Sequence, residues 1–227
     1  MGKKCLCENI LMKWQNRYHN TMKKLIVLLF ISCFLVAETK TIAISYFDNT
    51  SSKDEWNHIS KGIADMLITD LSNVESIQIV EREKLEEIIQ EQNLALTGII
   101  DESKAAQVGK LLGAKLILTG SFLIMGETMR IDARLLDVST GKVIMAKKIE
   151  GKKNSFFQLE KILVNKLIST LDLKLTRGET RKIKKVQTES FESFSAYSSG
   201  LDAFDNGEYD MAMKSMEEAV ELMKDLI

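Results

Sequence analysis

The chain of 227 residues contains no proline, three cysteines and two histidines. Without proline, its tight turns depend on glycine, asparagine, aspartate and serine. Because His19 lies ahead of an apolar segment at 25–37, only His58 remains for chemistry, which excludes a multi-His metal site and a His-based triad. Asp48 could ligate a metal, but a polar turn with residues 49–50 explains it better. We therefore expect a non-enzymatic protein with no catalytic residue, metal or cofactor.

An excess of positive charge is also missing. The 31 lysines and arginines nearly balance the 32 acidic residues, which gives a formal net charge of -1. A general nucleic-acid-binding surface normally shows a strong basic excess, so nucleic acid is not an expected partner. The basic stretch 174–190 is interpreted as a solvated linker, with a patch for anionic lipid or nucleic acid as the alternative.

An export signal is indicated at residues 22–37. Met22 and two lysines form a basic start, and an apolar run from Leu25 to Ala37 follows. The run is shorter than the roughly 20 residues of a membrane-spanning helix. We interpret it as a signal peptide, with an uncleaved signal anchor as the alternative. Residues 1–21 do not fit such a signal and are interpreted as an upstream extension, translation starting at Met22.

Two processing sites compete within this signal. Cleavage after Ala37 is slightly favoured, although Leu35 occupies a position that prefers a small residue. The Ser-Cys pair that ends at Cys33 resembles the end of a lipoprotein processing site, which makes Cys33 the candidate for lipidation and a lipid anchor. Either outcome leaves no free thiol in the folded part, because Cys5 and Cys7 lie in the upstream extension.

Strand patterns and helical patterns follow one another through residues 41–173. Three alternating runs between Gly113 and Lys152 are separated by short turns at 126–128 and 139–142, which predicts an antiparallel meander. Further strands are expected at 41–47 and 77–80. With the helices, the order is β-α-β-α-α-β-β-β-α. That order predicts an α+β fold in which helices cover a mostly antiparallel sheet.

The helices of this domain are predicted from apolar residues at helical spacing. The first covers Trp56 to Leu71, the second opens at 81–84 and continues to Gln92, and the third starts at Ser103 and stops at Gly113. A longer helix at 155–173 carries a nearly unbroken apolar stripe. These helices supply the apolar surface that a single-sheet domain needs for its core.

A helical hairpin is predicted at 191–227. Small residues at Gly200, Ala212 and Ala219 fall where two helices would approach closely, and Asn206-Gly207 makes the turn. The pattern looks like one tetratricopeptide repeat, although the usual tryptophan and proline are missing. A lone repeat cannot bury its own face, so it packs on the first domain or a partner unless more repeats follow Ile227. The candidate partner-contact residues are Tyr197, Phe204, Tyr209 and Met213.

Five segments in residues 41–173 carry a family resemblance. They are IAISYFDNTS, HISKGIADMLITDL, IQIVEREKLEEIIQEQNLALTGIID, AAQVGKLLGAKLILTGSF and RIDARLLDVSTGKVI. In this order they resemble the CsgG family of curli assembly and transport proteins and, more distantly, the FlgO and TolB amino-terminal domains. The resemblance implies a periplasmic or outer-membrane-associated assembly protein, often a lipoprotein and often oligomeric.

The turns of the meander modify what this resemblance implies. Pore-forming members of the family build a transmembrane barrel from long insertions in the central strands, and each spanning strand needs about 9 to 11 residues. The turns at 126–128 and 139–141 cannot supply a pair of them. We therefore predict a homo-oligomeric scaffold or secretion-accessory protein of CsgG type with envelope protein partners and without its own barrel. An outer-membrane secretion channel subunit is the alternative.

Overall fold

The computed structural model describes residues 39–81, 84, 87, 102–185 and 190–224. The expected upstream extension, the signal peptide with Cys33 and Ala37, and nearly all of the helix expected from 81–84 to Gln92 lie outside these residues. Thr39–Ile227 forms one unit. Its described elements are β1 (Lys40–Asn49), η1 (Asp54–Trp56), α2 (Ile59–Leu71), β2 (Ile77–Ile79), α4 (Glu102–Leu111), β3 (Leu116–Met125), β4 (Thr128–Asp137), β5 (Val143–Lys152), η2 (Lys153–Ser155), α5 (Phe156–Thr170), α6 (Arg177–Lys184), α7 (Phe191–Asp205) and α8 (Tyr209–Lys224).

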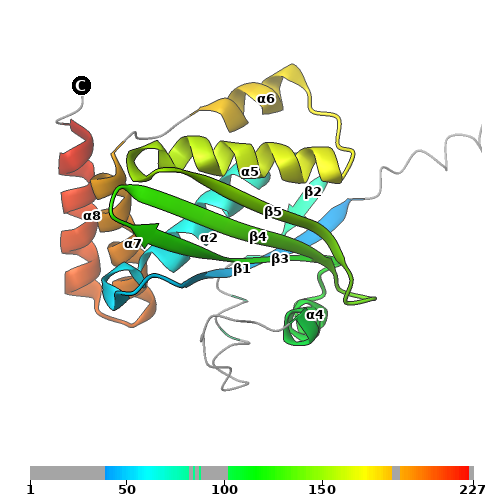
Figure 1. The fold of residues 1–227 in the computed structure, drawn as a ribbon, viewed down its shortest axis with the longest axis horizontal. Helices are drawn as coiled ribbons and strands as arrows, with labels where there is room; N and C mark the ends of the chain where they lie inside the picture. The colour runs from blue at the N-terminus through cyan, green and yellow to red at the C-terminus, as the bar shows by residue number, and fades with distance from the viewer. Residues whose placement is uncertain (1–38, 82–83, 85–86, 88–101, 186–189, 225–227) are drawn as a thin grey trace, which may run out of the picture. The chain divides into compact units, whose positions relative to one another are not determined.

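The strands form a mixed sheet in the order β2-β1-β3-β4-β5 (Figure 1). β1 runs parallel to both of its neighbours, with Ile42 paired to Ile79 on β2 and to Leu116 on β3. β3, β4 and β5 form an antiparallel meander in which Leu135 pairs with Leu118 and Met145. The structure confirms the predicted α+β fold and its meander. The parallel pairing of β1 with its neighbours was not predicted, because the alternation of residues along one strand does not indicate the direction of the strands beside it.

Short turns connect the strands of the meander. Gly126 closes the β3–β4 hairpin with a φ of +59°, and Gly141 lies in the β4–β5 turn with a φ of +68°. Glycine adopts such positive φ values without steric cost. In the second turn, Asp137 Oδ1 accepts hydrogen bonds from Ser139 Oγ and from the Thr140 N–H and hydroxyl. These bonds, the one from Ser139 first, lower the pKa of Asp137.

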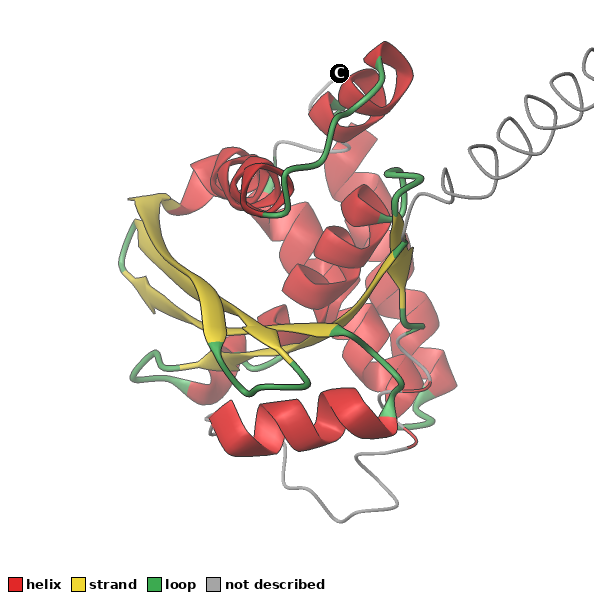
Figure 2. Cartoon of the chain, turned by 90° about the vertical axis from the view of Figure 1, so that its right-hand side faces the viewer, coloured by secondary structure: helices red, strands yellow, loops and turns green. Residues whose placement is uncertain are grey.

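Helices cover both faces of the sheet. α2 and α5 pack on one face, and α4 lies on the other (Figure 2). Met129, Ile131, Ala133 and Leu135 share one face of β4, and none of them is more than 1% exposed. Burying a large apolar side chain contributes roughly 1.5 to 3 kcal/mol, so this face anchors the fold. Within the described ranges, no helix has the length and hydropathy that a membrane crossing requires.

The helix α6 occupies part of the stretch that was predicted to be a solvated linker. Thr176 and Glu179 form a capping box, in which Thr176 Oγ1 accepts the Glu179 N–H at 3.2 Å and Glu179 Oε2 accepts the Thr176 N–H at 2.6 Å. Glu179 Oε1 also accepts the Glu75 N–H, and Ile183 is buried. The linker interpretation is wrong over 177–184. It missed the capping signal because only one apolar residue anchors this helix.

Replacement of Thr176 by alanine removes the side-chain acceptor at the start of α6. We expect Thr176→Ala to lower the free energy of unfolding by about 1 kcal/mol, the usual cost of losing an N-cap. Thr180→Ala is the matched control, because the Thr180 hydroxyl only bonds the Thr176 carbonyl within the helix. Urea unfolding of both variants measures the difference, and equal stability would show that the capping box does not hold α6.

Candidate functional site

The candidate functional site is built on the helical hairpin of α7 and α8. Ser190 Oγ caps α7 by accepting the Ser193 N–H at 3.0 Å, and Gly207 turns the chain with a φ of +76°. Ser193 Oγ then donates to the Ala219 carbonyl of α8 at 2.8 Å. A Cβ on Gly200 would lie 2.8 Å from Met216 Cε, so the two helices meet closely at this glycine. The hairpin therefore exists as predicted, while its relation to tetratricopeptide repeats stays a prediction.

Polar side chains on one side of α2 join this hairpin to the sheet domain. His58 Nε2 lies 2.7 Å from Ser195 Oγ in a hydrogen bond. Two helical turns after His58, Asp65 Oδ2 accepts a hydrogen bond from the Tyr197 hydroxyl at 2.8 Å. Burial lowers the pKa of His58, an effect that the charge of Asp202 opposes. His58 thus connects the start of α2 to α7 in the structure.

Lys61 provides the strongest charged contact between the two parts. Its Nζ lies 3.0 Å from Asp202 Oδ1 and 3.0 Å from Asp205 Oδ2, both on α7, and 5.7 Å from the Tyr46 ring centroid. The residue is only 8% exposed. Burial alone would lower the pKa of Lys61, but the hydrogen bonds and charges of the two aspartates outweigh it and raise that pKa. The ammonium group therefore stays charged between its partners.

Apolar packing completes the contact. Gly62 faces α7 so closely that a Cβ there would clash with Ser198 Oγ and lie 2.9 Å from Phe194 Cζ. Beside it, the rings of Phe194 and Phe156 on α5 lie 4.4 Å apart between centroids. Phe191 makes edge contacts with the rings of Trp56 and Phe156 at centroid distances of 5.9 and 6.1 Å. The hairpin is therefore packed into the same core that supports the sheet.

The predicted partner-contact residues divide into two groups. Phe204, Tyr209 and Met213 are 56%, 66% and 61% exposed, and the first two rings lie 5.6 Å apart at the hairpin turn. Tyr197 is instead half-buried and bonded to Asp65. Two other apolar residues of α8, Met211 and Val220, are also exposed. Whether any of these side chains contacts a partner stays a prediction.

A cavity of about 320 Å³ lies between the hairpin and the helices α2 and α5. Its apolar walls include Met66, Phe157, Phe194, Met216 and Val220. At its polar side it is lined by the carboxylates of two aspartates and by two lysines, which are Asp65, Asp70, Lys161 and Lys185. Both the sheet domain and the hairpin contribute walls, so the cavity exists only while the two are docked.

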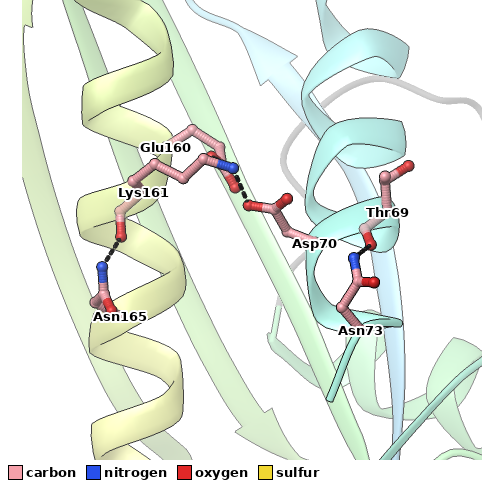
Figure 3. A network of polar contacts seen from close by, with 6 residues as sticks. All are labelled: Thr69, Asp70, Asn73, Glu160, Lys161 and Asn165. Carbon is pink, nitrogen blue, oxygen red and sulfur yellow. Dashed lines mark hydrogen bonds and ion pairs between the residues drawn. The ribbon is translucent and has the colours of Figure 1, made fainter. Parts of the chain in front are cut away.

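A charged group beside this cavity joins α2 to α5 (Figure 3). Lys161 Nζ forms an ion pair with Asp70 Oδ2 and lies 3.3 Å from Glu160 Oε2. Glu160 is 1% exposed, and neither of its carboxyl oxygens has a hydrogen-bond partner among the described residues. Burial and then the charge of Asp70 raise the pKa of Glu160 well above its ordinary value, against the influence of Lys161. The fold therefore favours the protonated form of Glu160.

Asp48, the carboxylate considered as a metal ligand, lies at the end of β1. Burial raises the pKa of Asp48 to about 7. The residues after it form the predicted polar turn, in which Asn49 Oδ1 accepts the Ser51 N–H and Thr50 Oγ1 donates to the Phe122 carbonyl. In the part of the chain that the structure describes, no three His, Cys, Asp or Glu side chains are grouped to hold a metal ion.

Gly62 offers a direct test of the docking of α7. We expect Gly62→Ala to lower the free energy of unfolding by about 1 to 3 kcal/mol, the cost of overpacking. Gly178→Ala in α6 should be neutral or stabilising, because only Thr176 Oγ1 at 3.8 Å lies near its added methyl group. Adding Ser198→Gly to Gly62→Ala should restore much of the loss in urea unfolding. A fully stable single variant would contradict the close approach of α7.

Glu160 and Glu179 predict opposite pH responses. The pKa of Glu160 is raised in the folded state, so the free energy of unfolding falls as pH rises above about 4.5. Glu160→Gln removes this dependence, so the variant should become more stable relative to the wild type as pH rises. Bonds from Thr176 lower the pKa of Glu179, so its stabilisation is present above that pH and is lost as pH falls. Glu179→Gln should therefore lower the free energy of unfolding most at neutral pH. Thermal unfolding from pH 4 to 8 measures both, and parallel profiles would refute the assignment.

Comparison with solved structures gives weak overall similarity. A lipoprotein of Neisseria meningitidis superposes with a TM-score of 0.45 and 19% identity, over 60% of this chain and 99% of that chain. The LpoB C-terminal domain from Escherichia coli gives a TM-score of 0.42 and 19% identity, over 54% and 93%. Scores of this size show a distant likeness and do not bear on function.

Sequence comparison is more informative about the family. The chain is 26% identical over 155 residues to a protein of Rhizobium meliloti (strain 1021) named "Putative adenylate cyclase 3", which covers 67% of this chain. The chain spans only about a quarter, 25%, of that relative. Residues 31–126 match the model of the family described as curli production assembly/transport component CsgG. The match supports an envelope-associated accessory protein. It covers less than half of the chain, and over residues 31–126 the chain is similar to the CsgG family, in agreement with four of the five sequence motifs.

Proposed function

We propose that this protein is an exported, non-enzymatic accessory protein that helps other proteins to assemble or to be secreted at the cell envelope. It acts in the periplasm or at the outer membrane, where Cys33 or the processed N-terminus determines how it is anchored. It associates with further copies of itself and with envelope proteins. The family match over 31–126 supports the setting, and the hairpin supplies the binding surface.

The observation that carries this proposal is the rigid mounting of an exposed apolar surface. Lys61 and Gly62 fix α7 against α2, while Phe204, Tyr209 and Met213 remain exposed on the other side of the hairpin. Exposed aromatic and methionine side chains are typical of adaptable protein-binding surfaces. A surface that is already held in place loses less conformational entropy on binding, so it can bind a partner more tightly.

The titratable residues support a structural role. His58, Lys61 and Asp65 each bind a residue of α7, and Lys161 binds Asp70 across two helices. The name adenylate cyclase belongs to a relative of which this chain covers a quarter, and we assign no such activity to this chain. Purified protein incubated with ATP should form no cyclic AMP above a heat-denatured sample, and product that depends on folded chain would overturn the non-enzymatic assignment.

Cell fractionation with mass spectrometry of the mature N-terminus tests the location and processing. We expect the protein in the envelope fraction with a start at Glu38 or a lipidated Cys33. A chain found in the cytoplasm with residues 22–37 intact would contradict the proposal. Conductance across liposomes that contain the purified protein would instead favour the secretion channel subunit.

Photo-crosslinking in cells tests the hairpin surface. A photoreactive residue at Tyr209 or Met213 should give adducts with envelope proteins, because both side chains are exposed beside apolar neighbours. Leu111 on α4, 51% exposed, is the matched control at a distant element. Adducts of equal yield at all three positions would show that the hairpin is not a preferred contact.

A further inference from the structure

The charges of this nearly neutral chain are strongly separated along its folded part. Residues 191–224, which contain the hairpin, have eight acidic and two basic residues, a net charge of -6. Residues 174–185, which contain α6, have six basic residues and one acidic residue, a net charge of +5. Charge separated in this way acts locally, because at about 0.1 M salt the Debye length is about 10 Å. The two regions must therefore be considered as separate surfaces.

The acidic surface lies on the outer side of the hairpin. Asp202 and Asp205 are occupied by Lys61, but the other six acids are exposed, and none of the six forms an ion pair with any residue in the described ranges. Five of them lie at the hairpin turn or on α8, where Lys214 is an exposed cation among them. Among them lies the exposed apolar side chain of Met213, and Val220, which also lines the cavity, follows two helical turns later on α8. We call this the acidic face, and its acids are Glu208, Asp210, Glu217, Glu218 and Glu221.

The basic surface is carried by α6 and its flanking residues. All six cations are exposed, and none forms an ion pair within the part of the chain that the structure describes. The single acid of the segment, Glu179, is 9% exposed and is occupied by Thr176 and the Glu75 N–H. Glu179 therefore offsets only part of the charge of this surface, through its electrostatic interaction with Lys182. We call it the basic face, and its residues are Lys174, Arg177, Arg181, Lys182, Lys184 and Lys185.

We propose that the acidic face of one copy of the chain docks on the basic face of a second copy. The two faces are complementary in charge: each copy supplies five exposed acids on one face and six exposed cations on the other, and neither set forms an ion pair among the described residues. Because the two faces differ, the contact is head-to-tail, and each copy added presents a free face of either sign until a ring closes. This inference rests on the self-association in the proposed function and specifies the surfaces that produce it.

Such a contact should depend strongly on salt. Ion pairs between exposed side chains are individually weak, and their strength falls as the Debye length shrinks to about 3 Å at 1 M salt. Complementary charged surfaces also steer the association of two molecules, so the charges determine which surfaces meet. The exposed Met213 adds apolar area to the acidic face. Assembly at low salt and dissociation at high salt are therefore expected.

Charge reversal followed by mixing tests the proposal. The full-length processed protein is examined by sedimentation velocity at about 0.05 M and about 1 M sodium chloride. Glu217→Lys combined with Glu218→Lys reverses part of the acidic face, and Arg181→Glu combined with Lys182→Glu reverses part of the basic face. Each variant alone should assemble about tenfold more weakly or worse. An equimolar mixture of the two should assemble again, because the reversed faces complement each other.

Matched controls keep misfolding from imitating the result. Glu127→Lys with Lys104→Glu reverses two exposed charges outside both faces and should leave assembly unchanged. Thermal unfolding of every variant confirms that the fold is intact, and recovery in the mixture could not occur if either reversed variant were unfolded. Glu217→Gln with Glu218→Gln should weaken assembly less than the reversal does.

Three outcomes would overturn the proposal, and they separate it from the proposed function. Assembly that is insensitive to salt and to both reversals would place the contact elsewhere and leave self-association standing. A monomer under all conditions would reject self-association as well, while fractionation would still decide the envelope location. A monomer that binds phosphatidylglycerol vesicles, and loses this binding with Arg181→Glu and Lys182→Glu, would assign the basic face to anionic lipid.

Discussion

The buried ammonium group of Lys61 is the interaction on which the arrangement of this chain depends. A charge taken out of water is costly unless it is paired, and Lys61, 8% exposed on α2, finds its two carboxylate partners only on α7. The partners are separated from it by more than 130 residues of sequence. The sheet domain therefore depends on the hairpin at this point, because without α7 the buried lysine loses both carboxylate partners.

The same contact explains how a single helical hairpin can be stable. Two helices cannot bury an apolar face on their own, and in repeat arrays a neighbouring repeat covers it. Here α2 takes the place of that neighbour, with Gly62 allowing close approach and Phe194 entering the cluster of aromatic rings around Phe156. The unburied side of the hairpin is then the outer side of α8. This arrangement fixes which residues are exposed, and so which of them are able to meet another protein.

The sequence predicted what is local and missed what is distant. The β3–β4–β5 meander followed from alternation and from glycine turns, which are decided by neighbouring residues. The role of Tyr197 did not follow, because its partner Asp65 lies 132 residues away and no periodicity relates the two. The burial of Glu160 beside Asp70 was likewise invisible, since a glutamate within a helical pattern is ordinarily solvated. The capping box of α6 is the exception, because it is a local signal that the charged composition of the segment conceals.

A net charge near zero is an average that conceals opposed surfaces. The chain-wide net charge of -1 includes a net charge of -6 on the hairpin and of +5 on the α6 segment. The charge per residue in each of these segments is therefore far larger than the chain average. The near-zero net charge therefore counts against polyanionic partners for the chain as a whole, but not for α6. What favours a self-contact over a polyanion at α6 is the acidic face: Lys214 is the one exposed cation among its acids in the described ranges, and none of these acids forms an ion pair there. A lipid or polymer on α6 would satisfy only one of these two faces.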